Sequence, residues 1–255
     1  MAGSLGRRAL AEFIGTALLV TAVVGSGIAA SRLSPHDIGL ELFENAVATG
    51  AALVAIILAV GPVSGAHLNP VITLLDRVFR GVSTPAAAVY IAAQMVGATA
   101  GGILANLMFS LSAIEVSTKV RTGGWLWLGE VIATFGLALV VFGVVRSPRA
   151  AVASFAVGAY ITGAYFFTSS TSFANPAVTI GRVFSNTFAG IAPSSVAAFA
   201  GFQLVGGAIA ALAIWILYPD AETVAPAIVV PHEADDRRPT APDPARRPAP
   251  SRDGG

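Results

Sequence analysis

Six apolar segments of about twenty residues each run through most of the chain, and a helix of that length spans the ~30 Å hydrocarbon core of a bilayer. They cover residues 10–30, 43–62, 85–109, 126–145, 150–168 and 195–218. Only 11% of the residues are charged, against about 25% in soluble domains, and the mean hydropathy is +0.75. The sequence therefore predicts an all-α membrane protein with six transmembrane helices.

The ends of the chain differ from this apolar body. The first segment follows Arg7 and Arg8, as in a signal peptide, but it is longer than an h-region and we interpret it as the first span. The last 37 residues are rich in Pro, Arg and Asp and cannot bury a core. We expect one membrane domain over residues 1–218 and a disordered cytoplasmic tail over residues 219–255.

The placement of basic residues predicts the orientation in the membrane. If the N-terminus is cytoplasmic, six basic residues fall in the inner segments before the tail and four in the outer segments. The inner set is Arg7, Arg8, Arg77, Arg80, Arg146 and Arg149, and the outer set is Arg32, Lys119, Arg121 and Arg182. Both termini are therefore expected in the cytoplasm. The balance of 15 basic and 14 acidic residues argues against a nucleic-acid partner.

The two halves of the chain repeat each other. "AEFIGTALLV" at 11–20 resembles "GEVIATFGLALV" at 129–140, which aligns Glu12 with Glu130. "AAQMVGATAGG" at 92–102 resembles "GFQLVGGAIAA" at 201–211, which aligns Gln94 with Gln203. Each half contains three spans, an odd number, so the second half enters the membrane from the opposite side. This is an inverted repeat, with repeat one at about 8–112 and repeat two at about 124–218.

A third pair of matching segments is too short to cross the membrane. "SGAHLNPVITL" at 64–74 resembles "TSFANPAVTIG" at 171–181, and each contains an Asn-Pro pair. Asn is a favoured N-cap and Pro a favoured first helical residue, so each pair predicts a helix start inside apolar sequence. Non-helical backbone at membrane depth is tolerated where it is buried or lines a water-filled cavity. The sequence thus predicts two re-entrant half-helices whose N-termini meet along a pore.

These features resemble the aquaporins of the major intrinsic protein family. The resemblance covers about residues 8 to 218 and implies a passive channel for water or small uncharged solutes. It also implies a homotetramer with one pore per subunit, no enzymatic activity and no cofactor. The pore motifs would be Asn69, Pro70 and Val71, and Asn175, Pro176 and Ala177. Val71 departs from the Ala that is usual in the family.

The resemblance also implies a selectivity filter built from four positions. By the family's spacing from the two Asn residues, these are Thr49, Gly163, Ser172 and Val178. Most members carry Arg at the fourth position, where it repels cations and donates hydrogen bonds to the solute. Thr, Gly, Ser and Val are all small, so we expect a wide filter. Such a filter resembles the aquaglyceroporin-like bacterial branch associated with arsenic resistance, and implies glycerol-like polyols, neutral metalloid hydroxides such as arsenous acid, and water as solutes.

Other polar residues have two interpretations each. Glu12 and Glu130 are proton-relay candidates as intramembrane carboxylates, but in the family the matching Glu accepts hydrogen bonds from the loop before each half-helix. His67 either braces its loop or gates the pore with pH. Arg182, four residues after Val178, either rings the outer mouth or braces a loop.

Three alternatives remain open at this point. The chain could be a mainly water-conducting pore, an inverted-repeat secondary transporter, or an adhesive or structural membrane protein whose pore is shut. It contains no Cys, which excludes disulfides, thiolate metal sites and a Cys nucleophile. Lys119 is the only Lys against 14 Arg, a bias that indicates a GC-rich bacterial genome and hence the bacterial inner membrane.

Overall fold

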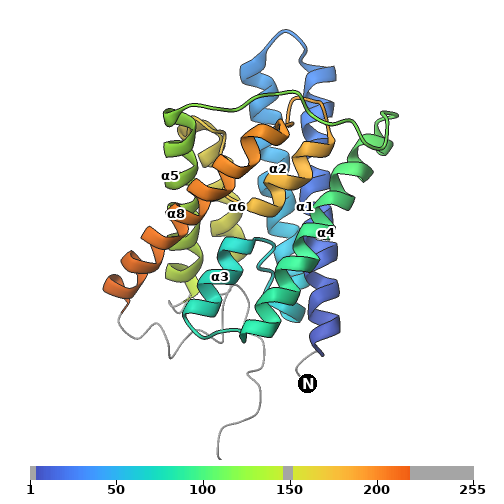
Figure 1. Ribbon diagram of the computed structural model, residues 1–255. Helices are drawn as coiled ribbons and strands as arrows, with labels where there is room; N and C mark the ends of the chain where they lie inside the picture. The colour runs from blue at the N-terminus through green and yellow to red at the C-terminus, as the bar shows by residue number, and fades with distance from the viewer. Residues whose placement is uncertain (1–3, 146–151, 219–255) are drawn as a thin grey trace, which may run out of the picture.

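The computed structural model describes residues 4–145 and 152–218, and both segments are almost entirely helical. The helices are α1 (Leu5–Leu33), α2 (Ile38–Ser64), α3 (Pro70–Val78), α4 (Thr84–Met108), α5 (Gly124–Val145), α6 (Ala153–Phe167), α7 (Pro176–Gly181), the 3₁₀ helix η2 (Arg182–Phe184) and α8 (Pro193–Leu217) (Figure 1). The tail expected over residues 219–255 lies outside the described residues.

Five of the described helices are long and apolar enough to cross a membrane, namely α1, α2, α4, α5 and α8. The sixth expected span corresponds to α6, whose 15 described residues are apolar and are about 22 Å long at 1.5 Å per residue. The predicted span began at residue 150, and residues 146–151 are outside the described part. The prediction of an all-helical, multi-pass membrane fold is confirmed.

The two halves of the molecule pack in the same way. Helix α1 packs against α2 and α4, and α5 packs against α6 and α8. Glycines allow the closest of these approaches: a Cβ on Gly97 of α4 would lie 2.4 Å from the Phe13 carbonyl oxygen of α1. In the second half, a Cβ on Gly206 of α8 would lie 2.5 Å from the Val131 carbonyl oxygen of α5. The two glycines each follow their repeat's Gln by three residues.

The short helices α3 and α7 occupy equivalent places in the two halves. Helix α1 begins, and α8 ends, at the side of the molecule where α3 lies, while the loop 109–123 crosses the opposite side (Figure 1). Helix α3 contacts α4 and α8, and α7 contacts α4 and α8 as well as α1. Neither half-helix crosses the molecule, and the two half-helices contact each other in its interior.

The motif residues start these helices as the sequence predicted. The Asn69 side-chain oxygen accepts a hydrogen bond from the Val71 N–H at 2.9 Å. The Asn175 oxygen accepts from Ala177 at 2.9 Å and from Val178 at 3.3 Å. In both helices Pro follows the Asn, where its missing N–H costs no hydrogen bond.

Candidate functional site: a cavity between the two half-helices

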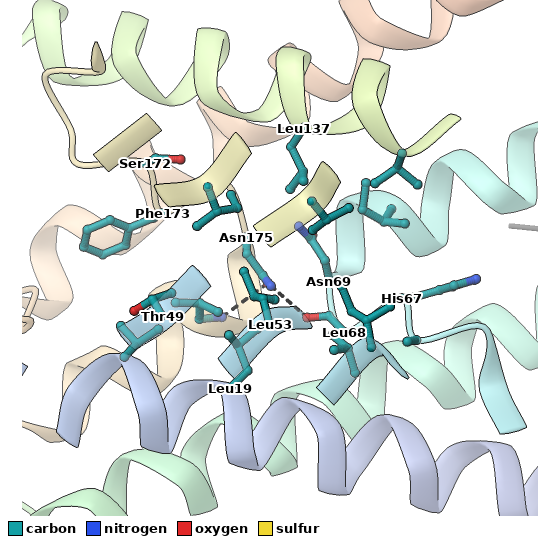
Figure 2. Close-up of a pocket in the computed structure, with 18 of the residues that line it drawn as sticks. Leu19, Thr49, Leu53, His67, Leu68, Asn69, Leu137, Ser172, Phe173 and Asn175 are labelled. Atoms are coloured by element: carbon teal, nitrogen blue, oxygen red, sulfur yellow. Dashed lines mark hydrogen bonds between the residues drawn. The ribbon is translucent and has the colours of Figure 1, made fainter. Parts of the chain in front are cut away.

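The two motif asparagines each bond to the other's loop. The Asn69 Nδ2 donates to the Ala174 carbonyl at 2.8 Å, and the Asn175 Nδ2 donates to the Leu68 carbonyl at 2.7 Å (Figure 2). Because a side-chain amide carries two N–H donors, each Asn keeps one N–H beyond this crossed pair. Both residues line a cavity, so the remaining donors are available to its contents.

The loop before each motif has a strained backbone. Ala66 and Leu68 have φ values of 49° and 52°, and Ser172 and Ala174 both have 49°. This left-handed region costs a non-glycine residue of order 1–3 kcal/mol and persists where surrounding contacts hold it. In each loop, backbone amides bond to a buried carboxylate, while the Leu68 and Ala174 carbonyls accept from the crossed asparagines.

Glu12 is the carboxylate that holds the first loop. Its two oxygens accept hydrogen bonds from the backbone N–H groups of His67 at 3.0 Å and Leu68 at 2.7 Å. The Ser64 hydroxyl at 2.6 Å and the Gln94 amide at 2.8 Å complete its shell. All four contacts are donors to Glu12, so this geometry provides a brace for the loop.

Glu130 has the same place in the second half. It accepts from the backbone N–H groups of Phe173 and Ala174, both at 2.9 Å, and from the Gln203 side chain. Glu12 and Glu130 are both fully buried, and neither lines the cavity. The brace geometry of Glu130 is therefore the counterpart of that of Glu12.

Of the motif residues, only the two asparagines line the cavity. Pro70, Pro176 and Ala177 are buried at the helix starts. Val71 is also buried, and a Cβ on Gly207 of α8 would lie 2.5 Å from its Cγ1. The larger residue at this motif position is thus accommodated by a glycine on the neighbouring helix.

Most of the cavity wall is apolar, with polar groups gathered at particular places. The apolar lining includes Leu19, Leu53, Ile72, Leu137, Val157 and Ile161. In Figure 2, His67 lies at one end, the two asparagines lie in the middle, and Thr49, Ser172 and Phe173 lie at the other end. We call these the α3 end and the α7 end, after the half-helix that follows each loop.

At the α7 end, hydroxyl groups and one arginine line the cavity. The Thr49 Oγ1 lies 3.2 Å from the Tyr165 hydroxyl oxygen. Ser172 is buried, yet its hydroxyl has no hydrogen-bond partner among the described residues. Val178 and Arg182, one helical turn apart, line the same end. Three of the four predicted filter residues, Thr49, Ser172 and Val178, are thus brought together.

The fourth predicted filter residue, Gly163, is not there. It lies on the exposed face of α6, and the atom nearest to a Cβ built on it belongs to the Phe167 ring, at 3.7 Å. The residues of α6 that line the cavity near this level are Ile161 and Tyr165. The prediction assumed a separation of twelve residues from Asn175, whereas Tyr165 precedes it by ten. Tyr165 therefore brings an aromatic ring to an end for which the sequence predicted none.

At the α3 end, His67 lines the cavity against a buried carboxylate. Its Nδ1 lies 3.2 Å from the Thr73 Oγ1, and its Nε2 lies 3.3 Å from the Asp76 Oδ2. The second contact is close in distance but is not aligned as a hydrogen bond. Sequence reasoning missed Asp76, on α3, because its spacing from His67 matches no motif that could have identified it.

The loop 109–123 brings further positive charge to the α7 end. Lys119 donates to the Phe188 carbonyl at 2.9 Å, and Arg121 Nε donates to the Gly190 carbonyl at 3.0 Å. Partial burial, with Arg121 and Arg182 nearby, lowers the pKa of Lys119 to about 8. Burial lowers the pKa of Arg121 to about 10, so this group stays charged at neutral pH.

Within residues 4–145 and 152–218, no group of three or more His, Cys, Asp or Glu side chains is arranged to hold a metal ion. The chemistry of the cavity is that of donors, acceptors and apolar surface along a passage, which suits binding and release of solute.

Comparisons with known proteins agree with this geometry. A family model described as "Major intrinsic protein" matches residues 2–172. The aquaglyceroporin AqpS of Rhizobium meliloti (strain 1021) is 48% identical over 217 residues, covering 84% of this chain and 92% of that protein. Aquaporin-5 of Homo sapiens is 30% identical over 238 residues, covering 86% and 84%.

Among solved structures, the X-ray structure of the aquaglyceroporin from Plasmodium falciparum superimposes with a TM-score of 0.67. The match covers 86% of this chain and 100% of that chain, at 20% sequence identity. At that identity the likeness concerns the fold alone.

Proposed function

Because this chain belongs to the major intrinsic protein family of membrane channels, we propose that it is an aquaglyceroporin-type pore for small uncharged solutes. Its solutes are glycerol-like polyols, neutral metalloid hydroxides such as arsenous acid, and water. Flux is passive and follows the solute gradient in either direction. The relative named aquaglyceroporin, which aligns over most of both chains, supports this solute class.

The observation that carries the proposal is the uneven lining of the cavity. Hydroxyl and amide groups of Thr49, Ser172, Asn69 and Asn175 supply hydrogen bonds, while most of the remaining wall is aliphatic. A polyol presents hydroxyls on one side and C–H groups on the other, so it exchanges its water shell for both kinds of wall. The unpartnered Ser172 hydroxyl is one such site for exchange.

The membrane orientation and assembly are further parts of the proposal. Both termini lie in the cytoplasm of a bacterial cell, so the α3 end of the cavity faces inward and the α7 end outward. Four copies assemble, each with its own pore. Large apolar side chains exposed on the described helices, such as Leu18, Phe43 and Trp125, fit burial by lipid or by neighbouring subunits. Native mass spectrometry of the purified protein tests the tetramer, and a reporter fused to either end tests the orientation.

The function is tested by swelling and uptake in proteoliposomes without any ion gradient. Glycerol, arsenous acid and water are followed separately, and all three should enter faster than into empty liposomes. Ile161→Trp places a larger side chain in the cavity and should stop the flux of all three solutes. Phe166→Trp, on the exposed face of α6, should not. Flux of water alone would support a water channel, and uptake that required an ion gradient would support a secondary transporter. Either result would overturn the proposal.

A further inference from the structure

Arg182 occupies a position at the α7 end that the sequence alone did not fix. It begins η2, immediately after α7, and it follows Val178 by four residues. Its side chain is 2% exposed, and it lines the same cavity as Val178. At 1.5 Å per residue, four residues correspond to about 6 Å along a helix. The backbone of Arg182 therefore lies about one turn beyond that of residue 178, and its side chain brings a guanidinium to the same cavity.

Two contacts with other residues hold the guanidinium. Its Nε donates to the Ala189 carbonyl, and its Cζ lies 3.5 Å from the centre of the Phe173 ring. Among the described residues it has no other hydrogen bond and no ion pair. Both Nη groups, with four N–H donors between them, are thus left for whatever occupies the cavity.

Acceptors and hydroxyls on other elements line the same end. Within residues 4–145 and 152–218, the Ser172 hydroxyl is buried without a partner, and the Thr49 and Tyr165 hydroxyls bond only to each other. A buried hydroxyl without a partner is unfavourable unless a ligand or water pairs with it. The free donors of Arg182 and the free Ser172 hydroxyl together indicate a place where a solute exchanges its hydrogen bonds.

We propose that Arg182 is a specificity-determining residue of this channel, supplying the positive charge and the N–H donors that Val178 cannot. This inference rests on the proposed channel function and deepens it. The charge of Arg182 repels cations, while the side chain at residue 178 stays small. Exclusion by charge and exclusion by size are therefore assigned to two different residues. A neutral polyhydroxy solute wider than water passes residue 178, while a cation is still opposed at Arg182.

Arg121 is a matched control, because it shares the anchoring of Arg182 but not its place in the cavity. Arg121 donates from Nε to the Gly190 carbonyl, next to the carbonyl that anchors Arg182. It also lies over the Phe173 ring, at 5.0 Å from its centre. Arg121 is not among the residues that line the cavity. Replacing it removes a nearby cation and a loop contact but leaves the charge on the cavity wall in place.

The test compares Arg182→Gln, Arg121→Gln and the parent in proteoliposomes, following potassium leak and glycerol uptake separately. Arg182→Gln should raise the potassium leak about tenfold, the effect of losing a barrier of ~1.4 kcal/mol, with glycerol uptake retained. Arg121→Gln should raise the potassium leak by much less and leave glycerol uptake near the parent. An unchanged leak in Arg182→Gln, or an equal rise in both variants, would overturn the inference.

A rescue keeps the test sharp. Since the chain has no Cys, Arg182→Cys creates a single thiol that can be modified with an aminoethyl or a methyl methanethiosulfonate. Both reagents form a mixed disulfide with release of methanesulfinate, but only the first restores a positive charge. The aminoethyl group should lower the potassium leak of Arg182→Cys again, and the methyl group should not. Equal effects of the two reagents would mean that size, and not charge, acts at this place.

If Arg182→Gln and Arg182→Cys carry no glycerol, the fold has been lost and Arg182→Lys answers the same question. It keeps the charge without the planar fork, so its potassium leak should remain that of the parent, and a tenfold leak would contradict the inference. A parent protein without glycerol uptake would instead contradict the proposed function. The two failures are therefore distinguishable.

Discussion

The hydroxyl oxygens of Thr49 and Tyr165 lie 3.2 Å apart and join α2 to α6 at the α7 end of the cavity. One residue comes from each half of the inverted repeat. Their contact limits the opening on one side, while Val178 and Arg182 line it from the half-helix segment. The α7 end is thus bounded by an aromatic ring as well as by small side chains. Its opening is therefore narrower than an opening lined by four small residues.

Tyr165→Ala should widen this end of the pore. Removing the ring takes away steric bulk and the hydrogen bond to Thr49, so uptake of glycerol and arsenous acid should rise relative to that of water. The measurement is paired swelling and uptake in proteoliposomes.

The control for this experiment is Gly163→Ala, because a Cβ there meets only the Phe167 ring at an ordinary contact distance of 3.7 Å. That variant should match the parent in every flux. If Gly163→Ala changed the selectivity and Tyr165→Ala did not, the original assignment of Gly163 would be restored.

Glu130→Gln should destabilise the loop that carries the second motif. Glu130 only accepts hydrogen bonds, from Phe173, Ala174 and Gln203, whereas a carboxamide places an NH₂ against one of these donors. A buried donor without a partner costs about 1–3 kcal/mol. The thermal unfolding midpoint in detergent should fall and water flux should decrease with it.

Glu115→Gln provides the comparison for this loss, since Glu115 is exposed in the loop 109–123. It should keep the parental midpoint. A proton-relay role for Glu130 predicts a different outcome, namely loss of a pH-dependent current at an unchanged midpoint.

Gly97→Val should disrupt the packing of α4 on α1. The new Cβ would lie 2.4 Å from the Phe13 carbonyl oxygen, so the helices must separate. Overpacking of this kind costs about 1–3 kcal/mol, and the unfolding midpoint should fall accordingly. Gly201→Ala on α8 has no atom within 4 Å of its new Cβ and should be tolerated. Equal midpoints for the two variants would contradict the close approach of α1 and α4.

Much of this architecture could be predicted because it depends on local rules applied twice. Each Asn-Pro pair specifies a cap and a first helical residue, and these begin a helix wherever they occur. Glu12 and Glu130 stand at matching places in the repeat, and in the structure they hold matching loops. The odd number of spans per half then sets the inversion of the second half.

Tyr165 and Arg182 could not be placed in the same way. The position of a pore-facing residue on α6 depends on the number of residues in the strained loop before Asn175. Counting back twelve residues from Asn175 gives Gly163, two residues before Tyr165. The direction of the Arg182 side chain depends on the Phe173 ring and the Ala189 carbonyl. Both contacts arise from tertiary packing, which helical periodicity does not predict.

The charge at the α7 end should depend on pH through Lys119. Its pKa is lowered to about 8 by partial burial and by Arg121 and Arg182, with Glu41 acting in the opposite direction. Lys119 is therefore charged below about pH 8 and neutral above it. Raising the pH on the side of the membrane that the α7 end faces, from about 7 to about 9, should increase potassium leak. The increase should be smaller than the increase caused by Arg182→Gln. Lys119→Gln should show the high-pH leak at both pH values; a parental pH dependence in this variant would assign the titration to another group.

Val178→Arg should separate the roles of size and charge in this pore. A long side chain at residue 178 narrows the cavity between Ser172 and Arg182, so uptake of glycerol and arsenous acid should fall more than water flux. The new charge lies four residues from Arg182, and like charges at that spacing destabilise a helix by about 0.2–0.5 kcal/mol, so the unfolding midpoint should fall slightly.

Because Arg182 already opposes cations in the parent, potassium leak should change little in Val178→Arg. In the Arg182→Gln background, the same substitution should bring the leak back toward the parent value. Swelling, uptake and potassium leak are measured on the four proteins side by side. If Val178→Arg lowered water and glycerol flux by the same factor, residue 178 would lie outside the constriction that selects between them. If it lowered the leak equally in both backgrounds, Arg182 would not be the residue that excludes cations.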